Sequence, residues 1–166
     1  KVAEETLQDS QTIEYVNAEN KALKTLYLYD WANSYQGAPA PLANHLANEC
    51  NRSFYISSKS KLDYSQMETL GPSNISSWSS LEDQLDIIKI NLDERLEPGD
   101  TLKIDLKYLV KIPDDKFTGV GINSSKGILL RDLFIGVAPR YDGEWLLNSN
   151  LGFRDYSGTP SSYEFN

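Results

Sequence analysis

Residues Thr101–Ile112 read TLKIDLKYLVKI and alternate apolar with mostly charged side chains over twelve positions. Because successive side chains of a β-strand point to opposite faces, this alternation predicts a long strand with one buried and one mostly solvated face. Leu109 is the one apolar residue on the predicted solvated face. The predicted buried face consists of Leu102, Ile104, Leu106, Tyr108, Val110 and Ile112.

The segment that precedes this strand has the same alternation. Asp86–Leu92 reads DIIKINL and places Ile88, Ile90 and Leu92 on one face. The link between the two segments carries Pro98-Gly99, a dipeptide typical of turns. We therefore predict that the two segments form an antiparallel pair.

The remaining pattern predicts further strands and a single helix. Pro41 suits the first turn of that helix, which is predicted to span about Pro41–Phe54. Several short strands with turn signals and one helix favour an all-β fold, an antiparallel β-sandwich with a short inserted α-helix, forming one domain over residues 1–166. The other predicted strand regions are Gln11–Asn17, Leu23–Trp31, Gly127–Val137 and Glu144–Asn148.

The charge composition of the chain argues against two classes of binding partner. The chain has 166 residues, with 16 Lys+Arg against 24 Asp+Glu and a net charge of -8. This acidic balance argues against binding to nucleic acid or to an anionic membrane surface, since both reward clustered basic residues. No apolar run approaches the length of a transmembrane segment. The chain opens on Lys and stops in SSYEFN, which resembles part of a strand, so we expect a piece of a longer protein.

The chemistry-bearing residues do not assemble into a catalytic set. A zinc hydrolase needs three protein ligands, and the chain has one histidine, His45. His45 and Glu49 are four apart, as in an ordinary ion pair on the surface of a helix. Cys50 lies five positions from His45, about 140° around a helix axis, so we predict a small buried residue rather than a nucleophile. Acidic pairs that could in principle hydrolyse glycosides, Glu82-Asp83, Asp93-Glu94 and Asp114-Asp115, fall in predicted loops, which favours solubility.

The aromatic residues leave two interpretations open. Tyr27, Tyr29 and Trp31 lie on one predicted strand face, and Tyr141 and Trp145 flank a turn. Exposed aromatic rows on a sandwich bind sugar rings or a partner protein. The same residues would also serve to pack against the helix or against a neighbouring domain.

Three segments resemble a bacterial branch of the aminopeptidase N family, the gluzincin zinc metallopeptidases. The first is LKTLYLYDWANSYQGAPAPLANHLANECNRSFYIS (Leu23–Ser57), and the second is LEPGDTLKIDLKYLVKIPDDKFTGVG (Leu96–Gly121). The third is LFIGVAPRYDGEWLLNSN (Leu133–Asn150), and order and spacing agree across most of Leu23–Asn150. All three are similar to parts of that family's N-terminal β-domain, a saddle-like sheet structure ahead of the catalytic domain.

The resemblance implies a non-catalytic domain that packs on the catalytic domain of the same parent protein. The zinc-binding His-Glu-x-x-His of such a parent lies outside this chain, so zinc is implied only for the catalytic domain. In relatives, the loop that matches Ala138–Asp142 approaches the substrate cleft, which makes Pro139, Arg140 and Tyr141 candidates for contact with a peptide substrate. The branch is mostly exported, which implies an extracytoplasmic location. The alternative is a stand-alone extracytoplasmic module that binds glycan or protein through Tyr27, Tyr29 and Trp31.

Overall fold

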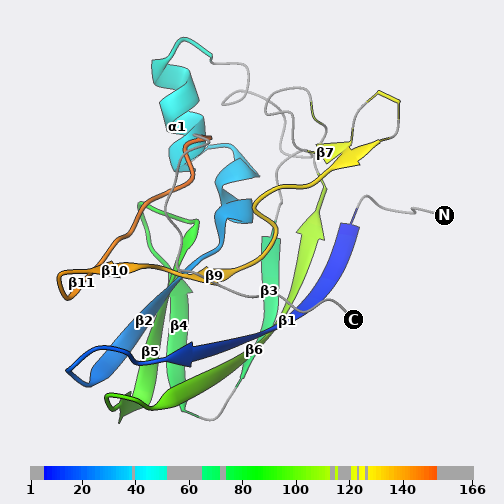
Figure 1. The fold of residues 1–166 in the computed structure, drawn as a ribbon. Coiled ribbons are helices and arrows are strands. Elements are labelled where there is room, and N and C mark those ends of the chain that lie inside the picture. Colours follow the sequence, from blue (N-terminus) through cyan, green and yellow to red (C-terminus); the bar gives the residue numbers. More distant parts are fainter. Residues whose placement is uncertain are drawn as a thin grey trace.

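The computed structural model describes residues 6–38, 40–51, 74–112, 115, 121–122, 124–125 and 127–152, and the backbone alone of 65–71. Strands dominate, and two helical segments follow the second strand, in agreement with the predicted all-β class (Figure 1). The elements are β1 (Thr6–Val16), β2 (Leu23–Tyr29), the 3-10 helix η1 (Trp31–Gln36), α1 (Pro41–Asn48), β3 (Ser65–Gly71), β4 (Ile75–Ser80), β5 (Ile87–Leu96), β6 (Thr101–Lys111), β7 (Gly121–Ile122), β8 (Ile128–Leu129), β9 (Gly136–Val137), β10 (Arg140–Tyr141) and β11 (Glu144–Trp145).

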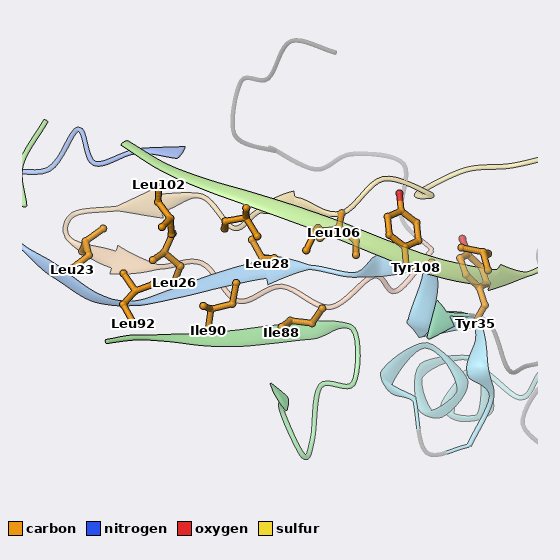
Figure 2. Packing of buried hydrophobic residues seen from close by; sticks show 14 of the residues in the cluster. Leu23, Leu26, Leu28, Tyr35, Ile88, Ile90, Leu92, Leu102, Leu106 and Tyr108 are labelled. Carbon is orange, nitrogen blue, oxygen red and sulfur yellow. The ribbon is translucent and has the colours of Figure 1, made fainter. Parts of the chain in front are cut away.

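The core lies between two main sheets. One sheet has the strand order β4-β5-β2-β9 and the other has the order β1-β6-β3. Figure 2 shows Leu102, Leu106 and Tyr108 of β6 facing the apolar side chains of β2 and β5. Tyr35 of η1 joins the same cluster at one end. The predicted packing of a β-sandwich is therefore observed.

The alternation in β6 is confirmed residue by residue. Leu102, Ile104, Leu106, Tyr108 and Val110 are all buried, and Ile112 just after the strand is buried as well. The intervening side chains are exposed except those of Leu109 and Lys111, which are half-buried. Strand β6 also has a neighbour on both sides, since it pairs antiparallel with β1 and with β3. It is the central strand of its sheet.

The predicted pairing of the segments on either side of Pro98-Gly99 is wrong. Strand β5 pairs with β2 and β4, whereas β6 belongs to the opposite sheet. The turn carries the chain across the core, and Gly99 adopts a φ of 85°, which favours glycine. Two strands that face each other across a sandwich have the same alternation as two that pair in one sheet, so the pattern could not distinguish these arrangements.

A second crossing lies beside the first. Residues 17–22 link β1 to β2, which are also in opposite sheets. The buried Asn17 joins the two crossings, because its backbone bonds Gly99 and Asp100 and its side-chain amide donates to the carbonyls of Lys21 and Leu96. Asn17 thus ties the two links between the sheets together at this end of the sandwich.

The helix is shorter than predicted. It ends at Asn48, and Cys50 follows in the left-handed region with a φ of 66°. Cys50 is exposed, so the prediction of a buried cysteine is wrong. Because α1 ends at Asn48 and Cys50 itself adopts the left-handed conformation, position 50 lies beyond the helix and does not share its buried face. Glu49 lies 3.8 Å from His45 (Oε1 to Nε2), which confirms the surface pair, and residues 52–54 lie outside the described part.

The carboxyl-terminal strand predictions are only partly correct. Within the predicted strand Gly127–Val137 the structure has two strands of two residues each, β8 and β9. Asp132 lies between them with a φ of 58°, which interrupts an extended chain. Residues 135–137 instead bridge the two sheets. Strand β9 pairs with β2, and the Gln11 amide of β1 both donates to and accepts from the Ile135 backbone.

Candidate functional site

The predicted contact residues Pro139, Arg140 and Tyr141 lie on a tight hairpin formed by β10 and β11. Asp142 and Gly143 form its two-residue turn, with φ values of 50° and 81°. Positive φ at both central residues matches the turns whose twist suits a β-hairpin, and Asp-Gly is a preferred sequence for them. The hairpin is therefore encoded locally.

Arg140 anchors the hairpin to the body of the domain. Its Nη2 donates to the carbonyl of Gly143, and its Nε lies 3.2 Å from Oε1 of Glu19 in the β1–β2 link. The guanidinium carbon lies 4.7 Å from the ring centroid of Trp145, a distance typical of a cation–π contact. Only 14% of the arginine side chain is exposed. Arg140 thus holds both ends of the turn and ties them to a neighbouring loop.

Trp145 completes the anchor on the other side of the arginine. Its ring centroid lies 6.3 Å from that of Tyr15 in β1 and 5.7 Å from that of Tyr27 in β2. The hairpin therefore rests on strands of both sheets. Burial raises the pKa of Tyr15, while the nearby Arg140 charge lowers it and that of Glu19 raises it. The phenol stays neutral and packs as a largely apolar ring.

Tyr141 differs from its two neighbours. Its side chain is 75% exposed, whereas Pro139 and Arg140 are half-buried. The Pro139 carbonyl accepts a hydrogen bond from the amide of Leu146, at 2.9 Å, which closes the base of the hairpin. Of the three predicted contact residues, two hold the hairpin and one faces solvent.

The aromatic residues Tyr29 and Trp31 are buried and stacked, with ring centroids 4.9 Å apart. Their polar atoms hold the chain that follows the hairpin. Tyr29 Oη donates to the Leu146 carbonyl, and Trp31 Nε1 donates to the Asn148 carbonyl at 3.0 Å. Trp31 begins η1 rather than ending a strand. Whether the row binds a ligand stays a prediction, but these two rings expose little surface.

Residues 146–150 form a strap without strand pairing, and side chains satisfy its backbone. Besides Tyr29 and Trp31, Gln84 donates to the Leu147 carbonyl at 2.9 Å. The buried Asp86 carboxylate accepts from the Asn150 amide at 2.7 Å and from the Ser149 hydroxyl at 2.9 Å. Burial raises the pKa of Asp86, and these two hydrogen bonds lower it again in part.

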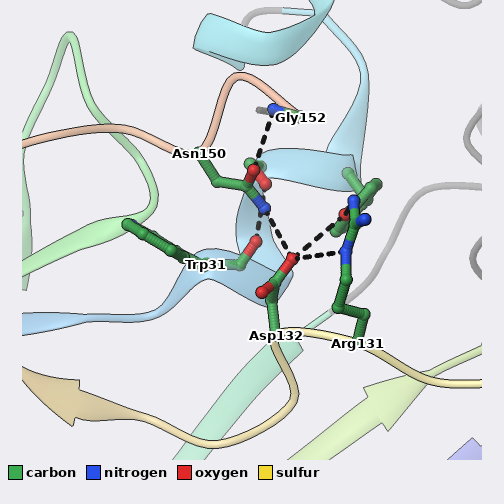
Figure 3. A network of polar contacts seen from close by, with 7 residues as sticks. Trp31, Arg131, Asp132, Asn150 and Gly152 are labelled. Atoms are coloured by element: carbon green, nitrogen blue, oxygen red, sulfur yellow. Dashed lines mark hydrogen bonds and ion pairs between the residues drawn. The ribbon is translucent and has the colours of Figure 1, made fainter. Parts of the chain in front are cut away.

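A second carboxylate holds the end of the strap. Asp132 Oδ2 accepts from Asn150 Nδ2 at 3.1 Å, from Arg131 Nε at 3.2 Å and from Tyr35 Oη at 3.3 Å (Figure 3). Burial raises the pKa of Tyr35, so its hydroxyl stays protonated and donates. The network joins η1, the segment before β9 and the strap. These hydrogen bonds hold the three segments together, and Asp132 accepts all of the bonds given above. We therefore assign Asp132 a structural role.

Sequence patterns did not single out Glu19, Asp86 or Asp132. Each is one acid among 24, and nothing local distinguishes a buried carboxylate from an exposed one. The described residues contain no group of three or more His, Cys, Asp and Glu side chains placed to hold a metal ion. In the same residues, no helix is long and apolar enough to cross a membrane.

Comparison with known proteins gives no identification, because no family model, curated protein or solved structure matches the chain.

We expect Arg140→Met to loosen the hairpin without unfolding the domain. The variant loses the Gly143 hydrogen bond, the Glu19 contact and the cation–π contact, together worth about 1–3 kcal/mol of local stability. Amide hydrogen exchange of Glu144 and Leu146, which lie at the hydrogen-bonded pairs of the hairpin, should speed up accordingly. Arg95→Met, at an exposed arginine of β5, is the matched control and should leave these amides unchanged. Equal exchange in both variants would contradict the anchoring role.

Proposed function

We propose that this chain is a non-catalytic β-domain of an aminopeptidase N-like zinc metallopeptidase. In this proposal it packs on the catalytic domain of its parent protein and helps to shape the substrate cleft. The observation that carries the proposal is the hairpin of β10 and β11, which presents the exposed Tyr141 from a base held by Arg140 and Trp145. This is the loop that the family resemblance places beside the cleft.

A preformed hairpin lowers the free-energy cost of making a contact. A loop that becomes ordered on binding loses conformational freedom, which weakens the complex. The hairpin has a two-residue turn, an arginine bonded to that turn and a base closed by the hydrogen bond from Leu146 to Pro139, so little freedom remains to be lost. Tyrosine offers a large apolar ring with a hydroxyl at its end, which suits contact with a peptide or a neighbouring domain.

The zinc ion, the catalysis and the extracytoplasmic location belong to the parent protein in this proposal and rest on the resemblance. The contribution of this chain is shape and contact. A stand-alone module that binds glycan or protein through Tyr27, Tyr29 and Trp31 is less well supported. Tyr29 is 7% exposed and Trp31 is 8% exposed, and both donate hydrogen bonds to the strap.

Tyr141→Ala in the full-length parent tests the proposal. We expect KM for peptide substrates to rise about tenfold, equivalent to about 1.4 kcal/mol of lost contact, with little change in the stability of this domain. Leu129→Ala removes another exposed large side chain, 61% exposed in β8, and serves as the control that should leave KM unchanged. An unchanged KM for Tyr141→Ala, or equal effects of the two variants, would contradict a role in the cleft.

A further inference from the structure

Strand β4 is an edge of the four-stranded sheet and carries no charged residue. It pairs with β5 on one side, and it stands last in the strand order among the described residues. Its sequence is ISSWSS, and the uncharged run around it, residues 69–81, is thirteen residues long. A longer run without Asp, Glu, Lys or Arg, residues 31–48, spans η1 and α1. Among the described edge strands longer than two residues, β4 alone has no charged residue.

The other sheet edges carry features that discourage pairing between molecules. Strand β1 contains Asp9 and Glu14, strand β3 contains Glu68 next to a register irregularity, and β9 is two residues long. Charges, irregularities and short length are the usual means by which edge strands avoid further pairing. Strand β4 has an irregularity only at its start, between Ile75 and Ser77, so its backbone continues regularly through Ser77–Ser80.

The side chains of β4 are also open to solvent. Ser76 to Ser80 are all exposed, including Trp78 at 39%. Cross-strand partners share a face, so Trp78 lies on the core side of the sheet with Ile90, at its margin. Ser77 and Ser79 lie on the outer side, opposite Asn91 and Lys89. A new strand beside β4 would cover the tryptophan and pair the outward backbone groups.

We propose that β4 is the interface of a symmetric dimer, in which the β4 strands of two copies pair antiparallel about Trp78. The sequence Ser76-Ser77-Trp78-Ser79-Ser80 reads the same in both directions. In a twofold antiparallel pair the two Trp78 residues face each other and Ser77 faces the partner's Ser79. Two copies with a net charge of -8 repel each other, and this uncharged strand lets their backbones meet without opposing like charges. The contact is short, so the dimer is weak and depends on concentration.

Sedimentation velocity of the purified chain tests the proposal with three double variants. Ser77→Glu/Ser79→Glu places like charges opposite each other in the proposed register and should weaken association about tenfold. Ser77→Lys/Ser79→Glu places opposite charges at the same positions and should keep the wild-type association. Gln8→Glu/Ser10→Glu adds the same two charges to the exposed face of β1 and should leave the dimer intact.

Several results would overturn the proposal. One is a wild-type chain that stays monomeric up to about 1 mM, the outcome expected if β4 instead pairs with a strand of another domain. A second is a dimer that survives Ser77→Glu/Ser79→Glu. A third is equal weakening of the dimer by the like-charge variant Ser77→Glu/Ser79→Glu and the opposite-charge variant Ser77→Lys/Ser79→Glu. Circular dichroism checks that each variant is folded. Wild-type amide exchange gives an independent test, since backbone amides of Ser77–Ser79 should gain protection as concentration rises while those of β1 do not.

Discussion

Leu106→Ala is expected to lower the free energy of unfolding by about 2–5 kcal/mol, the range for a leucine removed from a well-packed core. Leu106 is 1% exposed and lies in the main core cluster between the two sheets (Figure 2). Loss of its buried apolar surface and the remaining cavity both contribute to the effect. Chemical denaturation, with the midpoint and slope measured separately, gives the value.

Leu109→Ala is the matched control for this prediction. It removes the same side chain from the same strand, but Leu109 lies on the outer face and is half-buried. The expected loss is below about 1 kcal/mol, as for substitutions outside the core. Equal losses at positions 106 and 109 would contradict the assignment of the core to one face of β6.

Asp86→Ala is expected to destabilise the domain by about 1–3 kcal/mol. The substitution leaves the buried Asn150 amide without its acceptor and takes a partner from the Ser149 hydroxyl. The variant should also loosen the strap of residues 146–150, because Asp86 holds its end at Asn150. The rest of the strap is held by Tyr29, Trp31 and Gln84. Thermal unfolding measures the global effect, and amide exchange at Asn150 measures the local one.

Asp86→Asn separates the hydrogen bonds from the charge. The asparagine carbonyl can accept from the Asn150 amide while its amide donates to the Ser149 hydroxyl, so the loss should be smaller than for alanine. Burial raises the folded-state pKa of Asp86 above its unfolded value, so the native state binds the proton more tightly. The stability of the wild type relative to Asp86→Asn should therefore fall as pH rises from about 4 through the folded pKa. A relative stability that rises over this range would contradict the raised pKa.

The face of each long strand could be predicted from the sequence, and the sheet to which it belongs could not. Period-two alternation placed Leu102 to Ile112 in the core because burial and alternation have the same cause. The partner of β5 depends on where the chain turns after Pro98-Gly99, and both outcomes bury the same residues. The exposure of Cys50 goes with the early end of α1 and with the left-handed conformation of Cys50 itself. No local sequence pattern predicts that conformation.

The turn of the hairpin could be predicted from the sequence, and the contacts that anchor the hairpin could not. Asp142-Gly143 marks the turn locally, whereas Arg140 meets Glu19 from a distant part of the chain. The burial of Tyr29 and Trp31 has the same origin, because the strap that covers their polar atoms lies 117 residues further on and has no periodic pattern. Asp86 is held by residues 63 and 64 positions away. Long-range pairs between side chains and backbone leave little trace in local composition.

We propose above that this chain shapes and contacts a cleft whose chemistry resides in another domain. The most direct measurement is the sequence of the parent transcript downstream of the codon for Asn166. We expect a continuous reading frame that encodes His-Glu-x-x-His followed by a further glutamate, the ligand set of a zinc metallopeptidase. A reading frame that ends near Asn166, or continues without that motif, would contradict the proposed function.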